Sequence, residues 1–171
     1  MKTGSEHVCE IRHEIQIDAR PEKIFAFLIR RELMVDWLAP RVEANPVPGG
    51  AFRVSDFDGQ WIEGTYVEIW LNRSVAFTWG GIEGLKIGQS NVKFTLHPFG
   101  SHTMLRLQHW DLPNSVFEEH DRRWRSHGLP RLKAAIEGRT QVGTYLSDVA
   151  TQRQFQRWSI SALPLGASGS W

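Results

Sequence analysis

Residues 118–138 read EEHDRRWRSHGLPRLKAAIEG, and this segment carries the longest helical pattern of the chain. It follows about five strand-like runs that are rich in Trp and Phe. A sheet that buries so many aromatic side chains needs a covering layer, and one late helix can supply it. The order therefore predicts a curved sheet that grips this helix around an apolar cavity.

The helix itself is predicted to have two unlike halves. His120, Trp124 and His127 fall at i, i+4 and i+7, so they share one stripe. Pro130 lacks an N–H, and together with Gly128 it should kink or restart the helix near His127. The second half carries its own apolar stripe: Leu129, Leu132 and Ile136. We expect the first half to line the cavity and the second half to join the core.

Upstream of the helix, alternating apolar and polar residues predict a sheet of about six to seven strands. The clearest runs are residues 10–19, 51–56, 61–71, 75–79, 92–96 and 103–110. Short turns between them indicate an antiparallel meander. Two short helices are expected after the first strand. Pro21 suits the first turn of one helix, and the other covers residues 31–37 and stops before Pro40.

Length and composition indicate one domain. The chain has 171 residues, of which 41% are hydrophobic, and no interior stretch is rich enough in Ser, Gly or Pro to separate two cores. We divide it into a polar N-terminal segment (1–9), a folded domain (10–138) and a C-terminal extension (139–171). Apolar residues in the extension either pack back on the domain or form a homodimer contact.

Charge and hydropathy disfavour two classes of partner. A net charge of +1 without a Lys and Arg stripe argues against nucleic acid. No run of eighteen apolar residues occurs, so no membrane span is expected, and the polar first ten residues lack the core of a signal peptide. The single cysteine, Cys9, fits a reducing compartment. A cytoplasmic location is predicted.

An ordered set of short segments resembles a known family. The segments are Ile24-Phe25, Trp37 to Pro40, Pro48-Gly49-Gly50-x-Phe52, Gly64 with Tyr66-Val67-Glu68-Ile69, Phe77-Thr78-Trp79, Thr103-x-Leu105-x-Leu107-x-His109, and Trp124 with Leu129-Pro130-x-Leu132. They cover roughly residues 10–138 and are similar to the homologues of the activator of the Hsp90 ATPase (AHSA1-like), within the START-like (SRPBCC) superfamily.

The resemblance implies an α+β helix-grip fold, with a strongly curved antiparallel sheet wrapped around the long C-terminal helix and a cavity between them. Members of this superfamily serve binding, transport and cyclisation, so the fold alone does not define the function. Two positions depart from the family pattern. Arg123 stands where the family usually has Gly before the helix tryptophan, and Leu38 stands where an aromatic residue commonly follows Trp37.

Candidate ligand-binding residues come from the aromatic faces and from two histidines. His109 should point inward at the end of a strand, and His120 lies near the start of the covering helix, so they can meet as polar anchors. The alternative is that both are hydrogen-bonded packing residues. The predicted cavity walls are Trp37, Phe52, Trp61, Phe77, Trp79, Phe94 and Trp124. Ordinary core packing is the alternative for at least half of them.

Catalytic signals are weak. Glu63 and Glu68 lie five apart on one strand, which predicts opposite faces and no acid–base pair, and each is more simply an outer-face residue. His120 and His127 are roughly 10 Å apart along a helix, too far to share one zinc easily. The glycine-rich loop 80–88 lacks the Lys-Ser/Thr pair of a phosphate loop and better suits a flap over the cavity. No metal, cofactor or catalytic residue is predicted.

Three functions remain open on the sequence. The first is binding of a small apolar or aromatic molecule between sheet and helix. The second is a cyclase- or hydratase-like enzyme in which a pocket His or Glu moves a proton. The third, a chaperone-associated regulator, follows only from the family resemblance.

Overall fold

The computed structural model describes residues 8–55 and 59–138, and these form one antiparallel sheet of seven strands in the order β1-β7-β6-β5-β4-β3-β2. The predicted extension 139–171 and all but two residues of the segment 1–9 lie outside the described residues. The strands are β1 (Val8–Ile17), β2 (Arg41–Ala44), β3 (Ala51–Ser55), β4 (Trp61–Trp70), β5 (Ser74–Trp79), β6 (Ser90–Phe99) and β7 (His102–Pro113). The predicted meander runs from β2 to β7, and β1 joins beside β7.

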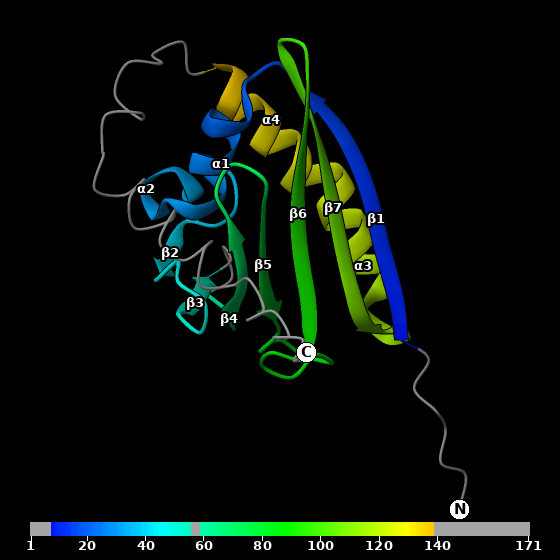
Figure 1. Ribbon diagram of the computed structural model, residues 1–171. Coiled ribbons are helices and arrows are strands. Elements are labelled where there is room, and N and C mark those ends of the chain that lie inside the picture. Colours follow the sequence, from blue (N-terminus) through cyan, green and yellow to red (C-terminus); the bar gives the residue numbers. More distant parts are fainter. Residues whose placement is uncertain (1–7, 56–58, 139–171) are drawn as a thin grey trace, which may run out of the picture.

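Helices cover one face of this sheet. They are α1 (Pro21–Ile29), α2 (Arg31–Met34), α3 (Asn114–Arg123), the π-helical turn η1 (Trp124–Gly128) and α4 (Leu129–Gly138). Figure 1 shows the strands curling around α3 and α4, with α1 and α2 beside the β2–β5 part of the sheet. The α+β helix-grip architecture predicted from the sequence is confirmed.

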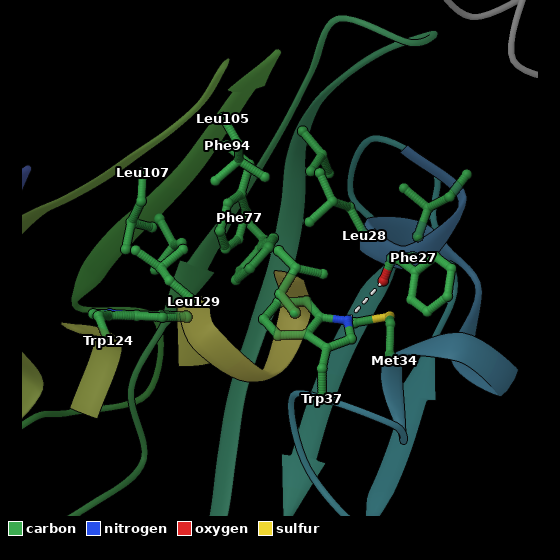
Figure 2. Packing of buried hydrophobic residues seen from close by; sticks show 14 of the residues in the cluster. Phe27, Leu28, Met34, Trp37, Phe77, Phe94, Leu105, Leu107, Trp124 and Leu129 are labelled. Carbon is green, nitrogen blue, oxygen red and sulfur yellow. Dashed lines mark hydrogen bonds between the residues drawn. The ribbon is translucent and has the colours of Figure 1, made fainter. Parts of the chain in front are cut away.

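The short helices hold the segment that reaches the cavity. Pro21 occupies the first turn of α1, as predicted. The helix α2 is shorter than the predicted 31–37. After Met34 the backbone continues as a turn, in which the Met34 carbonyl accepts from the Trp37 N–H at 3.2 Å and from the Leu38 N–H at 2.8 Å. The Trp37 indole N–H donates to the Phe27 carbonyl at 2.9 Å, which fixes the ring against α1 (Figure 2).

The break predicted around Gly128 and Pro130 is a π-helical turn inside an otherwise continuous helix. The Leu129 N–H donates to the Trp124 carbonyl, an i→i+5 bond. A Cβ on Gly128 would lie 2.8 Å from Trp124 Cε3, so glycine lets the indole lie across the turn. Buried positions step by four before the turn, by five across it and then by three and four: Val116, His120, Trp124, Leu129, Leu132 and Ile136. The extra residue keeps both stripes facing the sheet.

The core lies between the sheet and these helices. The Phe52 and Phe77 rings stack with centroids 4.0 Å apart, and Phe77 approaches Phe94 at 6.3 Å. Figure 2 shows Phe77 and Phe94 from the strands facing Trp124 and Leu129 from the helix, with Trp37 on the other side. Aromatic packing thus joins the sheet to both helical layers.

Candidate functional site

A cavity of about 300 Å³ lies between the helix and strands β3 to β5, where the segment 37–39 closes one side. That volume is at the lower end of the range for small-molecule sites. The inner walls are buried and mostly apolar: Trp37, Ala39, Val54, Ile62, Trp79, His120 and Trp124. Half-buried Leu38 and Ile82 also line the cavity. The outer end is formed by exposed residues of the helix, so the cavity opens beside it.

The structure separates the predicted aromatic residues into three groups. Trp37, Trp79 and Trp124 line the cavity, and Trp79 and Trp124 are neighbours with ring centroids 5.6 Å apart. Phe52, Phe77 and Phe94 do not line it but pack behind these rings in the core: Phe52 contacts Trp79, and Phe94 contacts both Trp37 and Trp124.

Trp61 lies on the other face of the sheet. Its ring packs under the Arg53 guanidinium, 4.8 Å from the ring centroid. Arg53 alternates with the fully buried Phe52 and Val54, so it points outward, and Trp61 does so as well. Trp61 contributes a cation–π contact on the outer surface and no cavity wall.

His109 and His120 do meet, with ring centroids 5.4 Å apart. His109, however, lies behind the cavity wall in a chain of buried hydrogen bonds. The Trp124 indole N–H donates to His109 Nδ1 at 3.0 Å, and His109 Nε2 is 2.9 Å from Ser90 Oγ. The Ser90 hydroxyl in turn donates to the Trp79 carbonyl at 3.0 Å.

This chain fixes the tautomer of His109. An indole N–H can only donate, so Nδ1 of His109 must accept and the proton sits on Nε2, which donates to Ser90. Burial lowers the pKa of His109 well below its ordinary value, and the nearby His120 lowers that pKa further. His109 is therefore neutral and has both ring nitrogens occupied. Its geometry is that of the hydrogen-bonded packing residue, and through Trp124 it shapes the cavity wall.

His120 is the histidine that lines the cavity. Its Nδ1 lies 2.9 Å from the Val116 carbonyl, an acceptor, so Nδ1 carries the proton and Nε2 keeps a lone pair. Burial lowers the pKa of His120, and Arg123 adds to the lowering, against the raising effects of the Val116 carbonyl and Glu119. A neutral imidazole with an available acceptor atom thus faces the cavity.

Trp79 adds a donor to the same wall. Its indole Nε1 is buried and has no hydrogen-bond partner among the described residues. A buried N–H without an acceptor costs about 1–3 kcal/mol, so such groups are rare in native structures.

The two strand glutamates lie on the same face, which corrects the prediction of opposite faces. The register shifts between Tyr66 and Glu68, and this bulge adds one residue between the glutamates. Glu63 pairs with outward-pointing Arg53 at 3.3 Å, and Glu68 pairs with Lys93 at 2.9 Å. Neither carboxylate lines the cavity, in agreement with the outer-face role favoured for each.

The mouth of the cavity is basic. Four exposed side chains line it: Arg122, Arg123, His127 and Arg131. No Asp or Glu is among the lining residues that the structure describes. Among these side chains, Arg123 forms an ion pair with Glu119 at 2.8 Å.

Sequence reasoning missed most of this mouth. The His120, Trp124, His127 stripe continues four residues further to Arg131, so extending the helical spacing would have found that residue. Leu38 and Arg123, the two departures from the family pattern, both line the cavity. Ser90 gave no signal, because a small polar residue at a strand start carries no pattern.

The loop 80–88, predicted to be a flap over the cavity, is folded on itself. The backbone N–H of Gly81 donates to the Leu85 carbonyl at 2.9 Å, Ile82 and Leu85 form a β-bridge, and Leu85 is buried. Only Ile82 of this loop lines the cavity. Among residues 8–55 and 59–138, no three His, Cys, Asp or Glu side chains gather in a metal-binding arrangement.

Comparison with known proteins supports the family and the fold. The family model described as "Activator of Hsp90 ATPase homolog 1-like protein" matches residues 18–137, which lie within the predicted domain 10–138. No curated protein matches the sequence. Within the described residues, no helix is long and apolar enough to cross a membrane.

Solved structures share the fold. The AHSA1-like protein from Rhizobium etli is 28% identical, with a TM-score of 0.65 over 84% of this chain and 91% of that chain. The Aha1 dimer from Colwellia psychrerythraea is 25% identical, with a TM-score of 0.65 over 75% and 96%. An Hsp90 activator from Plasmodium falciparum, 20% identical with a TM-score of 0.60 over 75% and 96%, shows likeness of fold alone.

Proposed function

This chain belongs to the activator of Hsp90 ATPase homolog 1-like family, and we propose that it binds a small apolar or aromatic molecule in the cavity between sheet and helix. The observation that carries the proposal is the cavity of about 300 Å³ whose inner walls are Trp37, Trp79 and Trp124. Burying a flat apolar body against three indole rings removes apolar surface from water and gains ring contacts.

The inner wall also offers a donor and an acceptor. The Trp79 indole N–H lacks an acceptor, and His120 Nε2 keeps a lone pair while Nδ1 contacts Val116. A hydroxyl group can serve both, because it donates and accepts. We therefore assign the anchoring role to Trp79 and His120, and a positioning role to His109, which holds Trp124 through its Nδ1.

The test fills the cavity and measures binding of the fluorescent apolar probe N-phenyl-1-naphthylamine. Leu38 is half-buried in the cavity wall, so Leu38→Trp should occupy part of the space and weaken probe binding at least fivefold. Leu71→Trp is the matched control, because Leu71 is a partly buried core neighbour outside the cavity. Equal probe affinity in the wild type and Leu38→Trp, with both folded, would place the probe elsewhere and count against the proposal.

The proton-transfer alternative now depends on one residue. Both His109 nitrogens are hydrogen-bonded, and Glu63 and Glu68 are paired on the outer face. Two histidines line the cavity, and His120 is the buried one, whereas His127 is exposed at the mouth. The Nε2 lone pair of His120 can accept a proton from a substrate. A cyclase or hydratase reaction in this cavity would therefore be abolished by His120→Gln, with binding of N-phenyl-1-naphthylamine retained.

A chaperone-associated role is favoured only by the names of relatives. The Colwellia protein is called Aha1, and the Plasmodium protein is called an Hsp90 activator. Stimulation of the ATPase of purified Hsp90 by the full chain would support this role. An unchanged ATPase rate would leave the cavity as the functional site.

The same Colwellia structure is a dimer, and we extend that to the present chain as a proposal. The proposed contact is the extension 139–171, which lies outside the described residues. A chain that ends at residue 138 should then be a monomer by light scattering while the full chain is a dimer. Equal oligomeric mass for the two chains would remove the extension from the interface.

A further inference from the structure

The basic mouth restricts what the cavity can take, and we propose that its ligand is a small organic acid, an apolar body that carries one carboxylate or sulfonate. This inference rests on the proposed binding function and specifies its ligand class. The apolar body lies against the indole rings of Trp79 and Trp124, and the anionic group lies at the mouth beside Arg122 and Arg131.

The charge count at the mouth supports an anion. Three arginines and His127 line the outer end, and no Asp or Glu is among the lining residues that the structure describes. Arg123 is partly neutralised by Glu119 at 2.8 Å. Arg122, in contrast, makes no ion pair or hydrogen bond with the residues that the structure describes. Its five donors are thus available to a ligand, and a guanidinium suits a carboxylate or sulfonate in paired geometry.

The order of groups along the cavity also favours an acid over a neutral apolar ligand. The inner walls are buried indoles and aliphatic side chains, whereas every charged lining residue is exposed on the helix. An amphiphile inserted with its apolar end first leaves its charge at the mouth, where water still solvates it. The charge then avoids the desolvation cost of full burial.

Cavity size limits the acid to a small one. About 300 Å³ corresponds to roughly ten water molecules at the ~30 Å³ that each occupies in the liquid. This space suits one or two rings or a short chain. It is too small for the acyl chains of a bilayer lipid, so we assign the anion to a free small acid and not to a membrane surface.

Two fluorescent probes that share one apolar skeleton test the charge. 8-Anilinonaphthalene-1-sulfonate carries a sulfonate, and N-phenyl-1-naphthylamine lacks it. The sulfonate should bind the native full chain about tenfold more tightly at low salt, and the preference should shrink as salt screens the exposed arginines. Arg122→Gln should reduce the preference at least threefold without changing the affinity for the neutral probe.

Arg125→Gln is the matched control. It makes the same change in charge on the same helix, but Arg125 does not line the cavity and lies 3.9 Å from Asp121. It should leave the preference unchanged. Equal loss in the two variants would mean that only the net charge matters and would overturn the assigned mouth.

The outcomes also separate the two proposals. Equal affinity for both probes, with both weakened by Leu38→Trp, would overturn the acidic ligand and leave the apolar binding function intact. Failure of both probes to bind would overturn both. A third outcome is that the chain shows no preference for the sulfonate probe in solution but co-sediments with phosphatidylglycerol vesicles, and that Arg122→Gln abolishes this co-sedimentation. This outcome would assign the mouth to a membrane surface and overturn the small acid.

Discussion

Replacing His109 by Phe isolates the buried hydrogen-bond chain from the packing around it. Phe keeps a ring at the position but removes both nitrogens, so the Trp124 N–H loses its acceptor at 3.0 Å. Ser90 keeps its bond to the Trp79 carbonyl. One buried donor left unpaired costs about 1–3 kcal/mol. We expect His109→Phe to lower the free energy of unfolding by that amount at pH 7.5.

The cost should shrink in acid. Burial lowers the pKa of His109 in the folded state, so below about pH 6.5 the unfolded chain binds more protons than the folded one. Stability then falls as pH falls, by at most about 1.4 kcal/mol per pH unit for each such group. His120, whose pKa is also lowered, adds its own loss in the wild type and the variant alike. Between pH 7.5 and 5.5 the wild type should therefore lose about 1 kcal/mol more than His109→Phe.

Urea unfolding followed by tryptophan fluorescence at both pH values measures these terms. His97→Phe is the control at pH 7.5, since His97 is an exposed strand residue outside the buried hydrogen-bond chain, and it should match the wild type in stability. The reasoning is refuted if His109→Phe is as stable as the wild type at pH 7.5. It is also refuted if the variant loses as much stability as the wild type between the two pH values.

Two further predictions concern the π-turn and the outer face. Gly128→Ala places a Cβ 2.8 Å from the Trp124 ring and should lower the free energy of unfolding by about 1–3 kcal/mol through overpacking. Gly138→Ala is the control, because a Cβ added there meets no neighbouring atom within 4 Å, and it should not destabilise the protein. A thermal unfolding experiment in which Gly128→Ala is the more stable of the two variants would contradict this. Glu68→Gln weakens the ion pair with Lys93 on the outer face and should lower the free energy of unfolding by about 0.2–1 kcal/mol. Its affinity for N-phenyl-1-naphthylamine should match that of the wild type. An altered affinity would place Glu68 in the site.

Much of the architecture could be predicted because local patterns record it. Alternation along β7 predicted which residues face inward, and Thr103, Leu105, Leu107 and His109 are all fully buried. The spacing of apolar residues along the helix also predicted its two halves and the break between them. Periodicity predicts a face, however, and does not show what lies against it.

The glutamate positions show where local counting fails. On a regular strand, two residues five positions apart lie on opposite faces. One bulge between them returns the second residue to the face of the first, and this bulge follows from how β4 pairs with β5. The aromatic residues show the same limit. Phe52 and Trp79 sit on neighbouring inward faces with similar burial, yet one belongs to the core and the other to the cavity wall.

The sequence alone was enough to predict a curved sheet that grips a late helix, because burial of alternating and helically spaced side chains is a local property of the chain. The site depended on tertiary structure. Only folding places the N–H of Trp124 against His109 and leaves His120 to face the cavity, and only folding gathers Arg122 and Arg131 at one mouth. Hydrogen-bond partners and shared space are set by residues far apart in the chain, and no spacing rule contains them.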